Sequence, residues 1–339
     1  MKTSAPSRRN IPRKRLVTTL VPIIISFLTI EASIGILPTV DAFIMPPNSM
    51  TGRSQPHAAI ISSASSTGNG VHSAMMMVDE SMLETYDTLA TRLIDRYEKD
   101  AASNSLQNNQ LFVCVAGGPG SGKSTLSTAV AQRINEQMMP PTNNNSDDYE
   151  NNESSSAAVV LPMDGFHYSR SQLQSMGNSS DNSIDYTYDE LLARRGAPWT
   201  FDAEECIAAF TAARLNGYAS LPVYCRRKSD PVPDGVQLHP TTKFVLLEGN
   251  YLLAWDDARW APLQDNVFNE KWYIGCKSLE EQRERLVKRH LETWSEEKTK
   301  MWGEGEIGAG AKADANDMLN VGWIEDMSSR KYADLVIES

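Results

Sequence analysis

The stretch GGPGSGKS, Gly117–Ser124, constrains the fold of this 339-residue chain more than any other feature. It follows the continuous apolar run Leu111–Ala116, which is typical of a β-strand buried on both faces. It precedes residues 124–138, whose apolar positions recur at helical spacing. A buried strand, a glycine-rich turn and a helix in this order favour a mostly parallel sheet covered by helices on both faces.

The glycine-rich turn also predicts a ligand, because it matches the pattern G-x-x-x-x-G-K-[ST] in full. Glycines let backbone N–H groups surround phosphate oxygens, and the helix N-terminus adds its positive end. We therefore expect a nucleoside triphosphate here, with Lys123 at the terminal phosphates and Ser124 as a ligand of Mg²⁺. The predicted cradle consists of Gly117, Gly118, Pro119, Gly120, Ser121, Gly122, Lys123, Ser124 and Thr125.

Two other apolar runs each deliver an acid at their end. Residues 157–163 are followed by Asp164, and residues 242–247 are followed by Glu248. Ligands of open α/β sheets bind at the carboxyl ends of the strands, so both acids are candidates for the same site. Glu248 is predicted to support the metal ion, with a surface acid as the alternative. An Asp-Gly pair is also a common turn, so the residues alone leave the role of Asp164 open.

The net charge of -11 argues against a nucleic-acid partner, since phosphate backbones require a basic face. Without residues 1–42 the chain carries 26 basic and 41 acidic residues, a net charge of -15. The cysteines show no spacing that predicts a zinc site or a disulfide framework. They are Cys114, Cys206, Cys225 and Cys276.

The first 78 residues have the features of targeting segments. Basic residues precede the apolar run Leu16–Ile30, and the small residues Val40 and Ala42 then suit cleavage, which predicts a signal peptide over 1–42. Residues 43–78 contain no acid and are typical of a transit peptide. The pair resembles the bipartite presequences of algae whose plastids have extra membranes. We expect a plastid location, with the secretory pathway as the alternative, and no membrane insertion of the mature chain.

Residues 79–339 are predicted to form one domain, which opens with an amphipathic helix over 79–99. The polar, low-complexity stretch 140–156 is predicted to be a disordered insertion in that domain. The remaining predicted strands are 157–163, 242–249, 270–276 and 333–338, and the predicted helices between them include 201–215 and 278–294. This alternation predicts a three-layer α/β/α fold.

Six motifs in order carry a resemblance to a known family: GGPGSGKST, LPMDGFH, RRGAPWTFDAEE, DPVPDG, LLEGNYLL and RERLVKRH. Residues 82–337 resemble the P-loop kinases that include uridine kinase, phosphoribulokinase and pantothenate kinase, and above all their uridine kinase-like or fructose-transport kinase-like subgroup. The resemblance implies a P-loop NTPase fold with a small helical lid, and transfer of the γ-phosphate of ATP, with Mg²⁺, to a hydroxyl of a nucleoside or similar metabolite. The alternative is an NTPase or nucleotide-binding protein without an acceptor.

The same resemblance implies roles for individual residues. Asp164 would orient or deprotonate the acceptor hydroxyl, and Arg285 and Arg289 would close over the phosphates from the lid. An i,i+4 ion pair between Glu281 and Arg285 is the alternative for Arg285. Residues assigned to the acceptor are His167, Tyr168, Arg194, Arg195 and Tyr224. Asn316 and Asp317 would lie towards the nucleotide base.

Two of these assignments have open alternatives. A packed loop anchored by Trp199 is the alternative for Arg194 and Arg195. Relatives usually carry an aromatic-Asp-His sequence where this chain has Tyr224, Cys225 and Arg226. The basic run 226–228 therefore either binds an anionic acceptor or is an exposed loop. The acceptor and the oligomeric state are not determined by the sequence.

Overall fold

The computed structural model describes residues 80–138, 156–177, 186–265, 267–327 and 329–339, all within one compact unit, Ser73–Ser339. The signal peptide over 1–42 and the transit segment over 43–78 lie outside these residues, as does the insertion 140–156 apart from Ser156. These stay predictions. Within the described ranges, none of the helices combines the length and apolar character that a membrane span needs.

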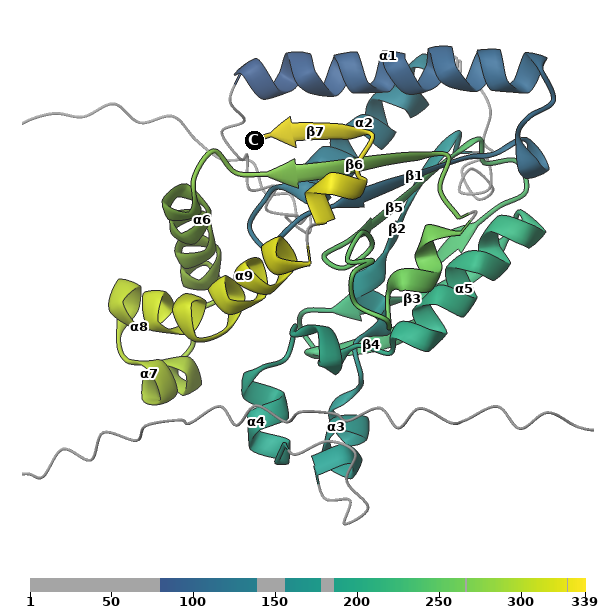
Figure 1. Ribbon diagram of the computed structural model, residues 1–339. Coiled ribbons are helices and arrows are strands. Elements are labelled where there is room, and N and C mark those ends of the chain that lie inside the picture. The colour runs from purple at the N-terminus through teal and green to yellow at the C-terminus, as the bar shows by residue number, and fades with distance from the viewer. Residues whose placement is uncertain (1–79, 139–155, 178–185, 266, 328) are drawn as a thin grey trace, which may run out of the picture. The chain divides into compact units, whose positions relative to one another are not determined.

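A five-stranded, all-parallel sheet forms the centre of the unit, with the strand order β2-β5-β1-β6-β7 (Figure 1). Every residue of the central strand β1 is buried, because β5 and β6 flank it and helices cover both faces. The predicted sheet is confirmed. The strands are β1 Leu111–Ala116, β2 Ala158–Pro162, β5 Phe244–Gly249, β6 Glu270–Gly275 and β7 Leu335–Glu338.

The alternation of side chains along β1 divides the core into two layers. Leu111, Val113 and Val115 face a core shared with α1, Glu80–Ala102, and α2, Lys123–Met138. The intervening residues of β1 face a second core shared with α5, Ala203–Asn216. Helices therefore cover both faces of the sheet, which confirms the three-layer α/β/α fold.

A buried carboxylate ties α1 to the sheet. Glu270 at the start of β6 is fully buried, and it accepts hydrogen bonds from Arg92 at 2.7 Å and from Arg96 at 2.8 Å. The indole N–H of Trp272 donates to the same carboxylate at 2.7 Å. Burial opposes the ionisation of Glu270, but these donors outweigh it and hold its pKa below the usual range.

Further helical segments of the described residues surround the core. Five of them follow β6 and form the helical lid region, where buried Leu286 packs against Ala309 and Ala313. The segments are α3 Arg170–Gly177, α4 Tyr188–Ala193, α6 Leu279–Leu291, α7 Glu296–Trp302, α8 Gly305–Lys312, the π-helical turn Ala313–Asp317 and α9 Met318–Asp326.

The structure contains a hairpin that the sequence analysis did not predict. Strands β3, Ala219–Cys225, and β4, Asp230–Leu238, pair antiparallel in a separate two-stranded sheet. Pro222, Pro231 and Pro233 lie inside these strands, and proline normally argues against a strand. A two-stranded ribbon tolerates proline because each strand has one unpaired edge.

Candidate active site

The predicted phosphate cradle lies between β1 and α2, where the structure has a tight loop over residues 117–122. Gly120 and Gly122 have φ angles of 80° and 87°, in the left-handed region that favours glycine. Gly120 also lies against α6, since a Cβ atom there would approach Leu286 Cγ to 2.9 Å. Both backbone conformation and packing therefore require the glycines that the motif supplies.

Lys123 is buried at the first position of α2, and its Nζ donates to the carbonyl of Gly118 at 3.1 Å. Burial lowers the pKa of this lysine, while the charges of Glu248 and Asp164 oppose the shift. One ammonium group thus lies beside the glycine loop and within reach of two carboxylates. This is the arrangement that the motif predicts for a lysine that holds phosphates.

Glu248 lies at the carboxyl end of β5, and its Oε1 accepts a hydrogen bond of 2.7 Å from the hydroxyl of Ser124. Burial raises the pKa of Glu248, Lys123 lowers it, and the charge of Asp164 raises it. Hydroxyl and carboxylate oxygens are the ligands that Mg²⁺ prefers. The described residues contain no cluster of three or more metal-binding side chains. Mg²⁺ held mostly by phosphates and water needs only one or two protein ligands, so this pair fits it.

Asp164 lies in a short 3₁₀-helix, Met163–Phe166, directly after β2. Pro162, two residues before it, pairs in register with Glu248, so the two acids come from the ends of adjacent strands. The partly buried carboxylate forms no hydrogen bond or ion pair with the described part of the chain. Its charge nevertheless acts on Lys123 and Glu248. Asp164 is therefore an uncommitted acid beside the phosphate cradle.

His167 and Tyr224 flank this acid. The His167 ring lies 3.9 Å from the Phe201 ring and 4.8 Å from that of Tyr224, measured between centroids. The Nδ1–H of His167 donates to the backbone carbonyl of Asp164 at 2.8 Å, which leaves Nε2 as an acceptor. Burial lowers the pKa of His167, so the ring is neutral at pH 7. The structure thus brings both predicted acceptor residues next to Asp164.

Comparisons with known proteins add to this geometry. No family model matches the sequence. The chain is 28% identical over 263 residues to a Schizosaccharomyces pombe protein provisionally named uridine kinase C227.14, covering 74% of this chain and 89% of that protein. It is 35% identical over 140 residues to the ATP-dependent kinase-like protein notR' of Aspergillus versicolor, covering 38% of this chain and 71% of that protein. The chain belongs to the ATP-dependent P-loop kinases.

A solved structure supports the fold of this kinase. The crystal structure of a protein provisionally assigned as a fructose transport system kinase, from Silicibacter sp. TM1040, has a TM-score of 0.54 and 27% sequence identity. The superposition covers 74% of this chain and 98% of that one. The predicted P-loop kinase family and fold are thereby confirmed.

Arg195, assigned to the acceptor by resemblance, has structural partners instead. Its Nη2 donates to the carbonyl of Tyr168 at 2.7 Å and to Asp230 at 2.8 Å, and Nη1 donates to the carbonyl of Ser229. The side chain is only 9% exposed and lies over the Tyr224 ring. These contacts tie the β3–β4 hairpin of the kinase to the loop before α5, and they favour the packed-loop alternative.

Replacing Arg195 with methionine should therefore lower the stability of the kinase, by about 2–3 kcal/mol for a largely buried pair, in urea unfolding. Burial opposes the ionisation of Asp230, but the hydrogen bonds and charges of Arg195 and Arg170 together outweigh it and lower its pKa. The stabilisation is present at neutral pH and is lost as the pH falls through that lowered pKa, so wild type and variant should converge in acid. Arg259→Met, which removes a more exposed pair with Asp257, is the control. Unchanged stability with a raised acceptor KM would instead support acceptor binding.

Arg194 and Tyr168 have contacts with other parts of the structure. Arg194 donates to the carbonyl of Ala315 at 2.9 Å and to Asn320 Oδ1 at 3.1 Å, and so joins the π-helical turn to this loop. Burial raises the pKa of Tyr168, and the charge of Asp202, the N-cap of α5, raises it further. The phenol thus lies towards α5. The role of Arg194 and Tyr168 at the acceptor stays a prediction.

Arg289 lies where the lid meets the phosphate cradle. It donates to Asp317 at 3.1 Å, and His290 Nε2 lies 2.8 Å from the same carboxylate. Burial opposes the ionisation of Asp317, but His290 and Arg289 outweigh it and lower its pKa. The charge of Arg289 also reaches Lys123, whose pKa it lowers. Asp317 closes the π-helical turn, a feature frequent at functional sites.

Arg285 has different partners from Arg289. Its Nη2 donates to Glu281 at 2.6 Å and its Nη1 donates to the hydroxyl of Ser339 at 2.8 Å. The ion-pair alternative of the sequence analysis therefore describes its contact with Glu281. Gln282, on the same helix, donates to the carbonyl of Pro119, and no motif in the sequence marked it.

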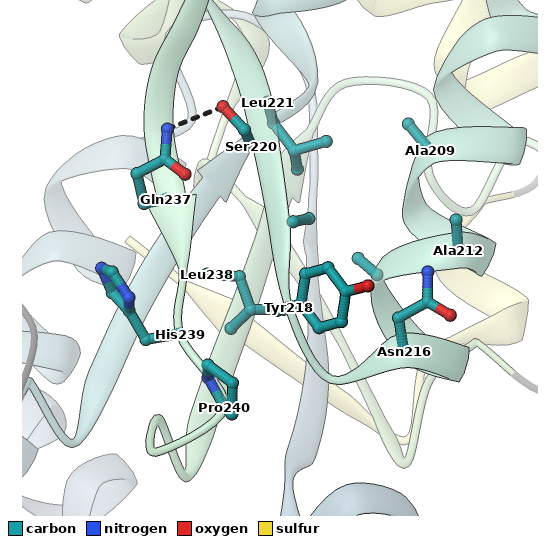
Figure 2. Close-up of a pocket in the computed structure, with 12 residues that line it drawn as sticks. Ala209, Ala212, Asn216, Tyr218, Ser220, Leu221, Gln237, Leu238, His239 and Pro240 are labelled. Carbon is teal, nitrogen blue, oxygen red and sulfur yellow. Dashed lines mark hydrogen bonds between the residues drawn. The ribbon is translucent and has the colours of Figure 1, made fainter.

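A separate hollow of about 660 Å³ lies between α5 and the hairpin (Figure 2). Ala209, Ala212 and Tyr218 line it together with the end of β4, and its lining contains no Asp, Glu, Lys or Arg. It contains none of the residues predicted for phosphate transfer. The candidate site, at the carboxyl ends of β1, β2 and β5, does not include this hollow.

Proposed function

We propose that this kinase transfers the γ-phosphate of ATP, with Mg²⁺, to a hydroxyl of a nucleoside or a similar polyhydroxylated metabolite. One observation supports it most directly: the uncommitted Asp164 follows the strand adjacent to that of Glu248, and both acids act electrostatically on Lys123. A bare NTPase has no need of an acid reserved for an acceptor. The nucleoside is suggested by the provisional name of the Schizosaccharomyces pombe relative.

In this proposal each residue has one task. Lys123 and the loop N–H groups hold the phosphates, and Ser124 and Glu248 supply oxygen ligands for Mg²⁺, which neutralises phosphate charge when bound. Asp164 accepts the proton of the acceptor hydroxyl as the hydroxyl oxygen bonds to the γ-phosphorus and the bond from that phosphorus to the leaving ADP breaks. During transfer, the Arg289 side chain leaves Asp317 and pairs instead with the negative charge that develops on the transferred phosphoryl group. The enzyme contributes mainly position and charge, as phosphoryl transfer requires.

The surroundings of His167 favour a neutral acceptor. A cavity of about 190 Å³ is lined by His167, Tyr168, Asp202 and Glu205, together with the prolines of the hairpin. Carboxylates accept hydrogen bonds from sugar hydroxyls but repel anions. The exposed Arg226 is the opposing feature, since its charge reaches Glu248. An experiment can therefore decide whether the acceptor is neutral or anionic.

We expect ADP release by the purified protein to depend on a neutral nucleoside or sugar, with a phosphorylated product identified by mass spectrometry. The panel should contain nucleosides, neutral sugars and carboxylated or phosphorylated polyols. For a neutral acceptor, Arg226→Gln should change KM by less than about threefold, because an exposed charge is screened by salt. A tenfold rise in KM with an anionic acceptor would reverse the assignment. ADP release indifferent to every acceptor would support the NTPase alternative.

A further inference from the structure

The carbonyl oxygens of the glycine loop are held by side chains from outside the loop. Pro119 O accepts a hydrogen bond of 2.7 Å from Gln282 Nε2 on α6. Ser121 O accepts one of 2.9 Å from the hydroxyl of Ser339, which follows β7. Between them, Gly120 O lies 3.7 Å from the thiol of Cys276. Three consecutive carbonyls of the phosphate cradle thus have external donors.

These contacts fix the direction of the loop N–H groups. In a trans peptide the carbonyl and the following N–H point in opposite directions, because the unit is planar. Holding Pro119 O against α6 turns the N–H of Gly120 away from α6, and holding Ser121 O turns the N–H of Gly122 away from Ser339. Glycine has the widest conformational freedom of all residues, so these two peptides have little stiffness of their own.

The donors are themselves fixed. Gln282 is 5% exposed, and a Cβ atom at Gly118 would approach its Nε2 to 2.8 Å. The hydroxyl of Ser339 accepts a hydrogen bond of 2.8 Å from Arg285, which leaves its own hydrogen for Ser121. Arg285 is held in turn by Glu281. The support therefore consists of α6 and the residue after β7.

We propose that Gln282 and Ser339 are positioning residues, which preorganise the N–H groups of Gly120 and Gly122 for the β-phosphate of the nucleotide. They touch neither nucleotide nor acceptor and act through the loop carbonyls. The inference rests on the use of ATP by the kinase. It gives Arg285 a task other than the one predicted from the family, since Arg285 orients Ser339.

The test is the affinity for nucleotides that do or do not reach the cradle. Gln282→Met keeps the length of the side chain and removes the donor, and it should weaken ADP binding by about tenfold, as expected for a buried acceptor left unpaired. AMP binding should change by less than about twofold, because AMP lacks the β-phosphate. KM for ATP should rise more than kcat falls. Ser339→Ala should also weaken ADP binding. Ser339→Thr keeps the hydroxyl and should bind ADP with wild-type affinity.

Gln132→Met is the matched control, because Gln132 is an exposed residue of α2 whose amide, among the described residues, hydrogen-bonds only to Glu136, at 2.8 Å. Isothermal titration calorimetry gives each dissociation constant. ADP affinities of Gln282→Met and Ser339→Ala within twofold of wild type would overturn the proposal. If Gln282→Met does not fold, the two Ser339 variants decide. If the unaltered protein fails to bind ADP, the kinase assignment fails instead, and the two failures are distinguishable.

Discussion

Asp164→Asn should lower kcat by about 10²–10⁴-fold, the usual contribution of a general base. The substitution keeps the shape of the side chain and removes its charge, so the side chain at position 164 can no longer take the acceptor proton. ATP binding should be unchanged or slightly tighter, because one negative charge near Lys123 and Glu248 is lost. Steady-state kinetics and calorimetry with ATP measure the two quantities separately.

Asp189→Asn is the control for this change, since Asp189 is an exposed acid in the first turn of α4. It should leave kcat and ATP affinity at wild-type values. A loss of ATP binding together with activity in Asp164→Asn would show that the acid supports the fold or the metal site. Activity retained within a few fold would exclude Asp164 as the base.

Arg289→Ala should reduce kcat by about 10³-fold or more if the lid arginine stabilises the transferred phosphoryl group. Its charge already acts on Lys123 while it pairs with Asp317, so Arg289 lies on the cradle side of the lid region. ATP affinity should change much less than kcat, because the added charge to be stabilised exists only in the transition state.

Arg283→Ala serves as the control on the same helix. Arg283 pairs with Asp314 at 2.6 Å, and both side chains are about half exposed, so little should be lost. If Arg289→Ala lowers thermal stability but leaves kcat within threefold of wild type, its contact with Asp317 is structural. The closing role would then pass to another cation of the lid region.

The sequence predicted the sheet of this kinase well because its signals are local. Each parallel strand is an apolar run, and the glycine loop and Glu248 follow two of these runs directly. The β3–β4 hairpin was not predicted, because its strands contain proline and their pairing depends on residues outside each strand. The arginines were the least predictable part. Arg195 and Arg285 are typical anion-binding residues by type, but their partners, Asp230 and Ser339, are set by tertiary packing.

The strand order also has a consequence for how the protein is made. The middle strand β1 is translated first, yet its neighbours β5 and β6 begin only at Phe244 and Glu270. Arg92 on α1 binds Glu270, which lies 178 positions later in the chain. Such distant pairings make folding slow, because long loops must close before contacts form. A ribosome must therefore release the chain at least as far as β6 before α1 and β1 are covered by their partners, so both remain exposed to solvent during most of synthesis.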